Sequence, residues 1–369
     1  MMSDIVISGY HGFANSGDEA LLWAILNTLK QKSPDISVTV LSKTPEETAR
    51  DYGVKSVNRY NFFKIRKEMK QAKMLIFGGG SLLQDVTSSK SLKYYLMIIA
   101  LAESCGLKTM LYANGIGPIR KRADRRLTAR IINKVDLITL RDDKSDEELK
   151  KLGVTKPEII ITADPAFTIN LKEALTGQYF IKRAGVPDGT KVCAVSIRSW
   201  KNSADNFSEV MASLCDYMSE RYNIHPLFVP MQYPLDMEVS KEVMDKMKHP
   251  SYIINRNLTV AEMFSVLSGA EVLIGMRLHS LIYATTLEIP AMALVYDPKI
   301  SAFMESLSQP YMVDVEYMDP DKMKETFDRL VEGLSEHREK LHSANAVLKK
   351  KAEENAEYAV RLLDKAKRS

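Results

Sequence analysis

The sequence has few residues of the kinds that cross-link a chain or anchor it in a bilayer. Its 369 residues include only three cysteines, Cys105, Cys193 and Cys215, and no Cys-x-x-Cys pair. This spacing argues against a disulfide framework and a thiolate zinc site, and it predicts a reducing compartment. The longest apolar run, 94–102, has nine residues, whereas a membrane-spanning helix needs about 20. No transmembrane helix is therefore expected.

Signatures of export and of several enzyme classes are also missing. The N-terminus lacks the basic segment and long apolar stretch of a secretory signal, so we expect a cytoplasmic protein. No histidine or cysteine spacing matches a metal motif such as H-E-x-x-H, and we expect neither an essential metal nor another cofactor. The absence of a P-loop and of a G-x-S-x-G turn argues against NTP hydrolysis and serine hydrolysis.

What is present is the composition of a soluble chain with an uneven charge. Hydrophobic residues make up 45% and charged residues 27% of the sequence, and the length predicts two domains at about 150 residues each. Residues 1–175 hold 27 Lys and Arg against 20 Asp and Glu, whereas residues 176–369 hold 24 against 27. The N-terminal half is therefore basic.

The stretch 120–130 carries the densest positive charge, six basic residues against the single acid Asp124. Such a run predicts an anionic partner, a polyanion or a membrane surface, although the solvated face of a helix has the same composition. No aromatic residues are interleaved with the basic ones, so nucleic acid is not the expected partner.

Short apolar runs alternate with helical patterns along the whole chain. This alternation is typical of βαβ units and predicts two Rossmann-like domains, each with a parallel sheet between helices. The expected strands lie at 4–10, 37–42, 73–80, 108–117, 137–141 and 158–164, and then at 191–198, 225–231, 251–255, 271–275, 291–296 and 312–315.

The strand pattern lapses between Ile169 and Pro187, and we place the domain boundary near residue 175. The predicted domains are residues 1–175 and 176–369. The segment 335–369 has no Gly or Pro and has apolar positions at helical spacing, which predicts a long terminal helix in the second domain. Ligands bind beyond the carboxyl ends of parallel strands, so we expect the active site in a cleft between the domains.

A glycine-rich turn, Gly9–Ala20, follows the first expected strand and carries Asn15, Asp18 and Glu19. It lacks the G-x-G-x-x-G fingerprint, and its carboxylates would repel a pyrophosphate, which argues against a nicotinamide cofactor. These polar residues either belong to a helix start, with Ser16 or Asp18 as cap, or bind sugar hydroxyls and take up a proton.

A second glycine-rich turn, 78–85, follows the third expected strand and contains Gly79, Gly80 and Asp85. Successive glycines permit close approach by a ligand or by another backbone. Because the carboxyl ends of parallel strands meet at one sheet edge, we expect this turn beside the first one.

Arginines follow strands in both halves. Arg198 follows one strand in the second half, and Arg277 and His279 follow another. A guanidinium group binds carboxylate or phosphate and a histidine can move a proton, so this group predicts a site for a small anion, although a lone histidine is more often structural. Arg141 ends a strand of the first half and is a third candidate, unless the adjacent Asp142 and Asp143 neutralise it.

Four segments in this order resemble the polysaccharide pyruvyl transferases, and the likeness covers almost the whole chain. They are Gly9–Ala20, Gly78–Asp85, Ser196–Arg198 and Gly275–Ser280. The sequence is most similar to the bacterial cell-wall branch, whose members pyruvylate the secondary cell-wall polymer that anchors S-layer proteins. The resemblance implies a GT-B-like fold and phosphoenolpyruvate as the donor.

The resemblance also implies the product, a 4,6-linked pyruvate ketal on a hexose or N-acetylhexosamine. In the cell-wall branch this sugar is a β-linked N-acetylmannosamine on a lipid-diphosphate carrier. The Arg-Leu-His triplet of the family serves the donor and corresponds to Arg277, Leu278 and His279, and we add Ser280 to this donor side.

Forming a ketal from an enol phosphate requires a proton at the methylene carbon, a stabilised cationic C2, two attacking hydroxyls and a departing phosphate. We expect Arg198 and Arg277, with Arg141, to clamp the donor, and His279 to act as general acid. Asp18 or Glu19 is expected to take the acceptor's proton, in an acceptor site that also includes Asn15, Gly79, Gly80 and Asp85. The basic stretch 120–130 would face a lipid diphosphate and the anionic inner leaflet, which predicts a peripheral membrane protein.

Two other functions fit parts of the sequence. A GT-B glycosyltransferase that uses a nucleotide sugar would share the fold, with Asp297 as the acid for the ribose, but no paired acidic motif surrounds it. A protein that only binds lipid-linked glycan would not require the Arg and His cluster.

Overall fold

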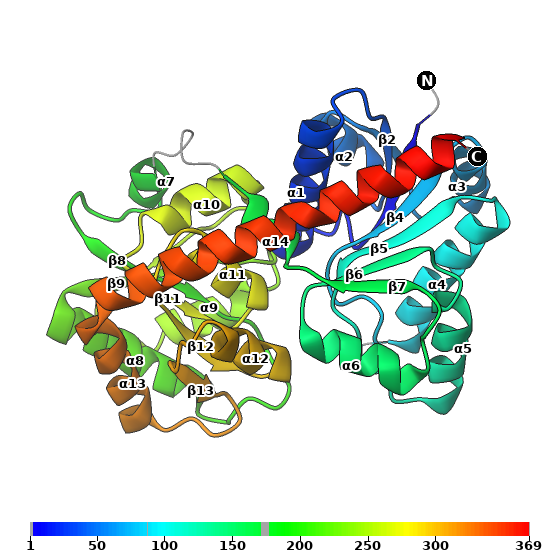
Figure 1. Cartoon of the computed structure of the whole chain (residues 1–369). Helices are drawn as coiled ribbons and strands as arrows, with labels where there is room; N and C mark the ends of the chain where they lie inside the picture. Colours follow the sequence, from blue (N-terminus) through cyan, green and yellow to red (C-terminus); the bar gives the residue numbers. More distant parts are fainter. Residues whose placement is uncertain (1–2, 87, 171–176, 369) are drawn as a thin grey trace. The chain divides into compact units, whose positions relative to one another are not determined.

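The chain forms two compact units, each built on a parallel β-sheet, in a computed structural model that describes residues 3–86, 88–170 and 177–368 (Figure 1). Unit 1 comprises Met1–Ile169 and Leu348–Ser369, and unit 2 comprises Asn170–Val347. Both sheets contain only parallel strand pairs among the described residues, as expected from alternating strands and helices.

Unit 1 has a seven-stranded sheet in the order β3-β2-β1-β4-β5-β6-β7. Its elements are β1 (Ile5–Ser8), α1 (Ser16–Lys32), β2 (Val38–Ser42), α2 (Pro45–Tyr52), β3 (Lys55–Asn58), α3 (Phe62–Met69), β4 (Met74–Gly78), α4 (Ser89–Ser104), β5 (Lys108–Asn114), α5 (Arg122–Ile132), β6 (Leu137–Leu140), α6 (Asp143–Leu152), β7 (Glu158–Ile161) and η1 (Pro165–Thr168).

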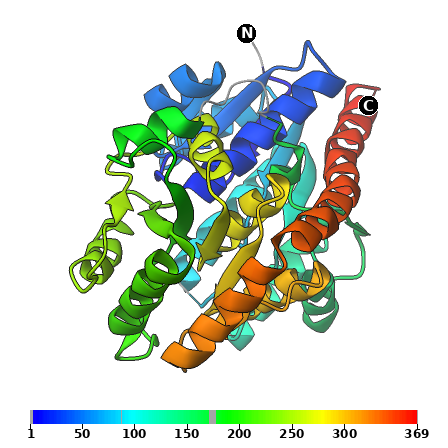
Figure 2. The same cartoon turned by 90° about the vertical axis from the view of Figure 1, so that its left-hand side faces the viewer.

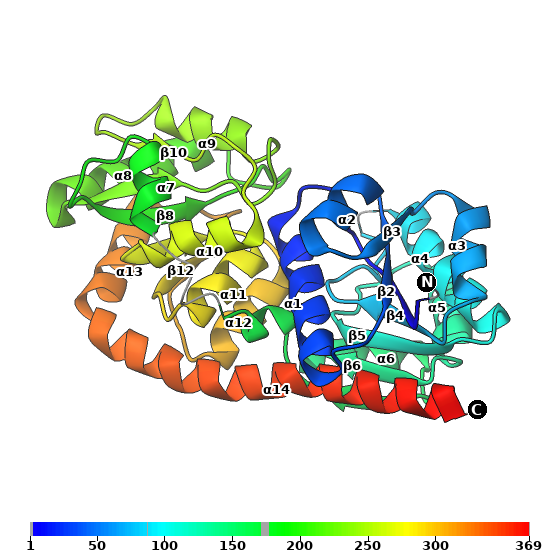
Figure 3. The same cartoon turned by 90° about the horizontal axis from the view of Figure 1, so that it is seen from above.

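Unit 2 has a six-stranded sheet in the order β10-β9-β8-β11-β12-β13. Its elements are α7 (Gly177–Arg183), β8 (Lys191–Ser196), α8 (Phe207–Tyr222), β9 (Ile224–Phe228), α9 (Met237–Met244), β10 (Tyr252–Ile253), α10 (Val260–Ser268), β11 (Val272–Gly275), α11 (Leu278–Thr286), β12 (Ala291–Val295), α12 (Pro298–Ser306), β13 (Met312–Asp314) and α13 (Pro320–Glu332). The last helix, α14 (Leu334–Arg368), is one continuous helix (Figure 3).

Helices cover both faces of each sheet because buried strand residues alternate between the faces. In unit 1, α3, α4 and α5 pack on one face, and α1 packs on the other together with the C-terminal part of α14. In unit 2, α8, α9 and α13 share a core on one face, where α8 and α13 lie side by side (Figure 2). These are the layers of a Rossmann-like fold.

The strand order of each sheet reverses once, and this reversal marks where a ligand is expected. In unit 1 the chain builds outward from β1 through β2 to β3 and then returns to the other side of β1 with β4. In unit 2 it does the same from β8, returning with β11. In open α/β sheets, ligands bind beyond the carboxyl ends of the strands at this switch point.

The structure corrects the placement of the terminal helix. The sequence put all of 335–369 in the second domain, but Leu348–Ser369 belongs to unit 1. Ala356, Ala359 and Leu363 are buried in the unit 1 core, and Asn355 Oδ1 accepts a hydrogen bond of 2.8 Å from Thr162 Oγ1. The predicted boundary near residue 175 falls on 171–176, which lie outside the described residues.

Candidate functional site

The unit 2 switch point brings together the basic residues that follow β8 and β11. The two strands are neighbours, with Ser196 beside Gly275, and the Met276 amide donates to the Ser196 carbonyl at 2.8 Å. Arg198 and Arg277 therefore leave adjacent strands at the same edge of the sheet. His279 lies in the first turn of α11, which begins directly after Arg277.

Arg277 is held by a carboxylate from the loop that follows β9. Its Nε and Nη2 donate to the two oxygens of Asp236 at 2.7 and 2.5 Å, and Nη2 also donates to Gln232 Oε1 at 3.2 Å. Asp236 accepts two further bonds, from the Met231 and Gln232 amides. One edge of the Arg277 fork thus faces the protein, and the pair is nearly buried, with side chains 11% and 2% exposed.

Arg198 lies in a different electrostatic setting from Arg277. No carboxylate among the described residues pairs with it. Its guanidinium carbon lies 5.4 Å from the Tyr296 ring centroid and 6.0 Å from that of Trp200, and these two rings are 4.8 Å apart. Aromatic faces stabilise a cation without neutralising it. Half-buried Arg198 therefore keeps its full positive charge available to an anion.

The start of α11 contributes a third positive element to this edge. His279 is half-buried, with its ring centroid 6.3 Å from that of Tyr283 one turn later. Leu278 begins the helix, and Ser280 Oγ donates to the Arg277 carbonyl at 2.6 Å. The amide groups of a first helical turn have no intrahelical acceptors and carry partial positive charge, which favours anions.

At the unit 1 switch point, the polar residues of the first glycine-rich turn hold the turn itself. Asn15 is the N-cap of α1, so neither Ser16 nor Asp18 has the capping role considered from the sequence. Glu19 accepts from the Gly12 amide at 2.9 Å and from the Tyr52 hydroxyl at 2.7 Å. Burial raises the pKa of Glu19, with these hydrogen bonds acting in the opposite direction.

The second glycine-rich turn closes against the first. Gly79 and Gly80 have φ angles of 59° and 74°, which L side chains rarely adopt. A Cβ on Gly80 would lie 3.4 Å from Asp18 Oδ1, so the half-buried carboxylate of Asp18 borders this turn. Asp18 also raises the pKa values of Tyr10 and Tyr95 electrostatically, although burial is the larger cause for both hydroxyls.

Two further site candidates of unit 1 make buried structural contacts. Asp85 accepts from the Arg120 and Lys121 amides at 2.9 and 2.8 Å; these bonds hold its pKa low although burial opposes them. Arg141 Nη1 pairs with Asp164 at 2.5 Å and its Nη2 donates to the Ser81 hydroxyl. Asp164, rather than the adjacent acids considered from the sequence, is thus its main counter-ion; Asp142 is 3.9 Å from its Nε.

The unit 1 edge also contains a buried pair that the sequence analysis did not select. Arg59 follows β3, is 4% exposed and donates from Nη1 to the Gly9 carbonyl at 2.7 Å. His11 lies nearby in the first turn; burial, and next the charge of Arg59, lower its pKa to about 3 against a hydrogen bond with the backbone of Asp18. His11 is therefore neutral at physiological pH.

The structure sorts the candidate residues into two groups. One edge of unit 2 carries Arg198, Arg277, Leu278, His279 and Ser280, and one edge of unit 1 carries Asn15, Asp18, Glu19, Gly79, Gly80, Asp85 and Arg141. The sequence analysis missed Asp236 and Tyr296, which contact the two arginines of unit 2. The only sequence feature that could have identified them is their position: Asp236 follows β9 and Tyr296 follows β12.

Two Rossmann-like units of this kind define a GT-B-type protein, and solved structures confirm this class. The chain superposes on UDP-GlcNAc 2-epimerase from Neisseria meningitidis with a TM-score of 0.67 and 14% identity, covering 98% of this chain and 100% of that one. It superposes on Anabaena HepE in complex with UDP and glucose with a TM-score of 0.66 and 9% identity, covering 98% and 99%. At these identities the likeness shows the fold alone.

The family is given by the sequence comparisons. The profile of the polysaccharide pyruvyl transferases matches residues 15–298, which is most of the chain. An amylovoran biosynthesis protein of Erwinia amylovora, AmsJ, is 21% identical over 364 residues, covering 84% of this chain and 87% of the relative. The chain belongs to the polysaccharide pyruvyl transferase family. This membership indicates pyruvyl transfer onto a polysaccharide and confirms the family expected from the four motifs.

Proposed function

We propose that the protein transfers the pyruvyl unit of phosphoenolpyruvate onto a hexose or N-acetylhexosamine, forming a 4,6-pyruvate ketal and releasing phosphate. The proposed acceptor is the β-linked N-acetylmannosamine of a cell-wall precursor on a lipid diphosphate. The observation that carries the proposal is Arg198, a half-buried cation with no carboxylate partner among the described residues, which shares a sheet edge with Arg277 and His279.

The unit 2 edge has the charge distribution that this donor requires. Phosphoenolpyruvate carries a carboxylate and a phosphate close together. Arg198 and the first amides of α11 supply positive charge that is not already neutralised, whereas Asp236 offsets the charge of Arg277. In this arrangement Arg198 binds an anionic group of the donor, and Arg277 contributes the edge of its fork that Asp236 does not occupy.

The reaction balances with the two sugar hydroxyls as the source of both protons and hydrogen phosphate as the leaving group. A proton adds to the methylene carbon and makes it a methyl group, while one sugar hydroxyl forms a C–O bond to C2. The second hydroxyl then bonds to C2 as the C–O bond to phosphate breaks. The two hydroxyl protons end in the methyl group and on the departing hydrogen phosphate. His279 is the proposed acid for the methylene carbon or the phosphate.

The unit 1 edge is the proposed acceptor side. Asp18, whose Oδ1 would lie 3.4 Å from a Cβ on Gly80, or the neighbouring Glu19 is the carboxylate proposed to bind the sugar hydroxyls and take a proton. Gly79 and Gly80 are buried, and a Cβ on Gly79 would lie 2.8 Å from Leu21 Cδ1, so this turn packs closely against α1. Neutral His11 and charged Arg59 lie against Gly9 of the first glycine-rich turn.

The test is phosphate release from phosphoenolpyruvate by the purified full chain, with and without a lipid-diphosphate disaccharide that ends in N-acetylmannosamine. The proposal predicts acceptor-dependent phosphate release and a mass gain of one pyruvate ketal per phosphate. The same activity is expected after treatment with EDTA, because side chains supply both the acid and the positive charge of this mechanism.

Two parallel measurements separate the other functions. A nucleotide-sugar glycosyltransferase would be protected against unfolding by a nucleotide sugar and not by phosphoenolpyruvate, and it would release no phosphate from the latter. A glycan-binding protein would keep its ligand affinity and show no turnover, both before and after His279→Ala. Either result would contradict the proposed pyruvyl transfer and support the other function.

A further inference from the structure

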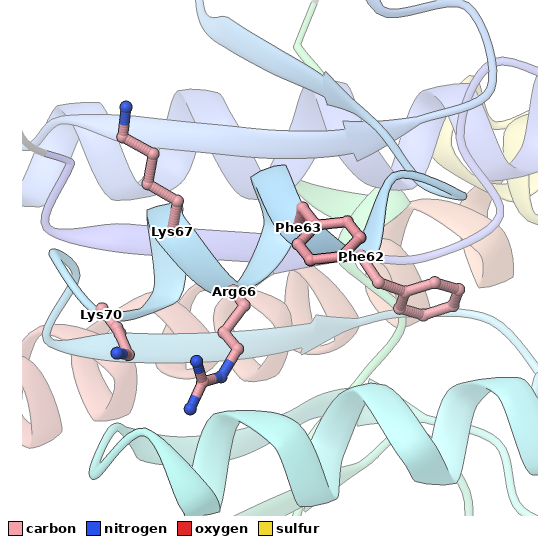
Figure 4. A pocket seen from close by; sticks show the side chains of 5 residues that line it. All are labelled: Phe62, Phe63, Arg66, Lys67 and Lys70. Atoms are coloured by element: carbon pink, nitrogen blue, oxygen red, sulfur yellow. The ribbon is translucent and has the colours of Figure 1, made fainter.

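Helix α3 presents an outward face of exposed aromatic and basic side chains. Phe63 is 92% exposed and Phe62 is 40% exposed in its first turn, directly after exposed Tyr60. The two rings lie beside a surface hollow of about 440 Å³, which is also lined by Arg66, Lys67 and Lys70 (Figure 4). We call this surface the α3 patch; it consists of Phe62, Phe63, Lys64, Arg66, Lys67 and Lys70.

The helix itself is well built, so the exposure of its aromatic residues is not a sign of poor folding. Asn61 caps its N-terminus by accepting from the Lys64 amide, and Ile65 and Met69 bury its inner face in the unit 1 core. The single acid of the helix, Glu68, also points inward, where it pairs with Lys55 at 2.6 Å.

The outward face therefore carries positive charge without compensation. Lys64, Arg66, Lys67 and Lys70 are all exposed, and none of them forms an ion pair with an acid in the part of the chain that the structure describes. An exposed phenylalanine gains free energy only if another phase or molecule covers it. Aromatic rings beside a cluster of cations fit an anionic lipid surface, where the rings enter the interface and the cations meet headgroups.

The basic stretch 120–130 lacks this combination. Arg125 donates to the Ile119 and Lys151 carbonyls and pairs with Glu148 at 3.3 Å, which ties it to the protein. No large hydrophobic side chain is exposed between residues 120 and 132. This stretch offers charge alone, whereas the α3 patch offers charge and an apolar anchor.

A chain of direct contacts connects the α3 patch with the glycine-rich turn of unit 1. The Phe62 ring lies 6.4 Å from that of Tyr94, and Arg59 stands over the Tyr94 ring at 4.6 Å. Arg59 in turn donates to the Gly9 carbonyl. A membrane in contact with α3 would thus lie near the edge where the acceptor is expected.

We propose that the α3 patch docks the protein on an anionic bilayer, with Phe62 and Phe63 in the interface and the four cations against the headgroups. This docking would bring a lipid-linked acceptor to the unit 1 edge. The delivery of the acceptor rests on the proposed function, whereas the docking does not.

The test is sedimentation of the full chain with phosphatidylcholine vesicles that contain either no phosphatidylglycerol or 30% of it, the latter also at high salt. Wild type is expected to bind only the anionic vesicles, and less at high salt. Replacing Lys64, Arg66, Lys67 and Lys70 by Gln should weaken binding by roughly 100-fold or more, since each surface cation contributes about fivefold. Phe63→Ser should weaken it by about 5- to 20-fold without affecting the fold, because this side chain is 92% exposed.

The matched control removes the same charge from the other basic stretch, by replacing Arg120, Lys121, Arg122 and Arg126 with Gln. The proposal predicts that this variant still binds anionic vesicles much more tightly than the α3 variant does. Equal losses in the two variants, equal binding of wild type to neutral vesicles, or no binding at all would overturn it. So would a dimer in solution that Phe63→Ser dissociates, because a second copy would then cover the patch.

Activity measurements test the docking surface separately from the proposed pyruvyl transfer. Phe63→Ser should retain wild-type turnover with a water-soluble acceptor and show a lower turnover with the same sugar on a lipid in anionic vesicles at limiting vesicle concentration. If wild type pyruvylates neither acceptor but binds vesicles through α3, the proposed function fails and the docking surface stands. If both acceptors react equally in all variants, the delivery step is wrong.

Discussion

The two units have the same sheet topology but use the polar residues of their switch points differently. Each edge contains a buried arginine–aspartate pair, Arg141 with Asp164 in unit 1 and Arg277 with Asp236 in unit 2. In unit 1 the remaining candidates mostly hold backbone, whereas in unit 2 Arg198 has no carboxylate partner among the described residues. The polar residues at the unit 1 edge hold the shape of its loops. At the unit 2 edge, Arg198 keeps a positive charge that can bind an anion.

The connections that follow β1 and β11 differ in length. The loop from β1 to α1 runs from Gly9 to Asn15, and its amides need acceptors, which Glu19 and Asn15 provide. In unit 2 only Met276 and Arg277 separate β11 from α11, so the helix begins at the sheet edge and its first amides lie there. Connection length does not account for Arg198, because ten residues, 197–206, separate β8 from α8.

The largest effect should come from the acid proposed at the unit 2 edge. His279→Gln is expected to lower kcat by about 100- to 10,000-fold, because proton transfer by a positioned side chain contributes that much, with a small change in the KM for phosphoenolpyruvate. Steady-state phosphate release measures both constants. His249→Gln is the matched control, since His249 pairs with Glu220 on the surface of the same unit. Equal activity of the two variants would remove His279 from the mechanism.

Breaking one partner of each buried pair tests whether both pairs are structural. Asp236→Asn and Asp164→Asn should each destabilise their own unit by about 3–5 kcal/mol, because an arginine is left buried without its counter-ion. Hydrogen exchange of the strand amides measures each unit separately. Asp236→Asn should also change the KM for phosphoenolpyruvate, and Asp164→Asn should not. A loss below about 1 kcal/mol would mean that the pairs behave like surface ion pairs.

The fold followed from local pattern far more completely than the site did. All the expected strands are present, because buried parallel strands are continuous apolar runs. β3 was missed because its sequence, Lys55–Asn58, has one buried residue and lies at the sheet edge. Its omission also hid Arg59, which follows that strand.

Site residues that act through a distant partner leave no local signal. Arg277 and His279 were visible as a motif, but Asp236 is 41 positions away from Arg277 and lies in a loop with no motif of its own. From the sequence, the three acids Asp18, Glu19 and Asp85 of unit 1 were all assigned to the acceptor site in the same way. Only the folded structure shows that Glu19 and Asp85 hold loops through hydrogen bonds to backbone amides.

Replacing Arg198, which has no carboxylate partner among the described residues, tests the unit 2 side of the comparison. Arg198→Met should raise the KM for phosphoenolpyruvate by about 10- to 100-fold, the effect of losing a charged hydrogen bond. Stability should change by less than about 0.5 kcal/mol, because no ion pair is lost. Arg198→Lys should recover part of the binding, and Arg183→Met, on the exposed surface of α7, should have no effect. An unchanged KM in Arg198→Met would assign the donor to another surface.

The smallest expected effect concerns neutral His11 at the unit 1 edge. Because the folded-state pKa of His11 is lowered to about 3, the unfolded chain takes up a proton below about pH 6.5 that the folded chain does not. His11 therefore contributes stability that is present above pH 6.5 and is lost as the pH falls toward 3. Between pH 8 and pH 5 this loss should be about 2 kcal/mol.

His11→Asn isolates that contribution, because asparagine is polar but does not titrate. Carboxylates with lowered pKa values, such as Asp85, are present in both proteins and lose their contribution at lower pH. The difference between the two proteins in hydrogen exchange of the β1 and β4 amides should therefore fall by about 2 kcal/mol from pH 8 to pH 5. A difference that stays constant with pH would mean that folding does not lower the pKa of His11, and that water reaches its ring in the folded turn.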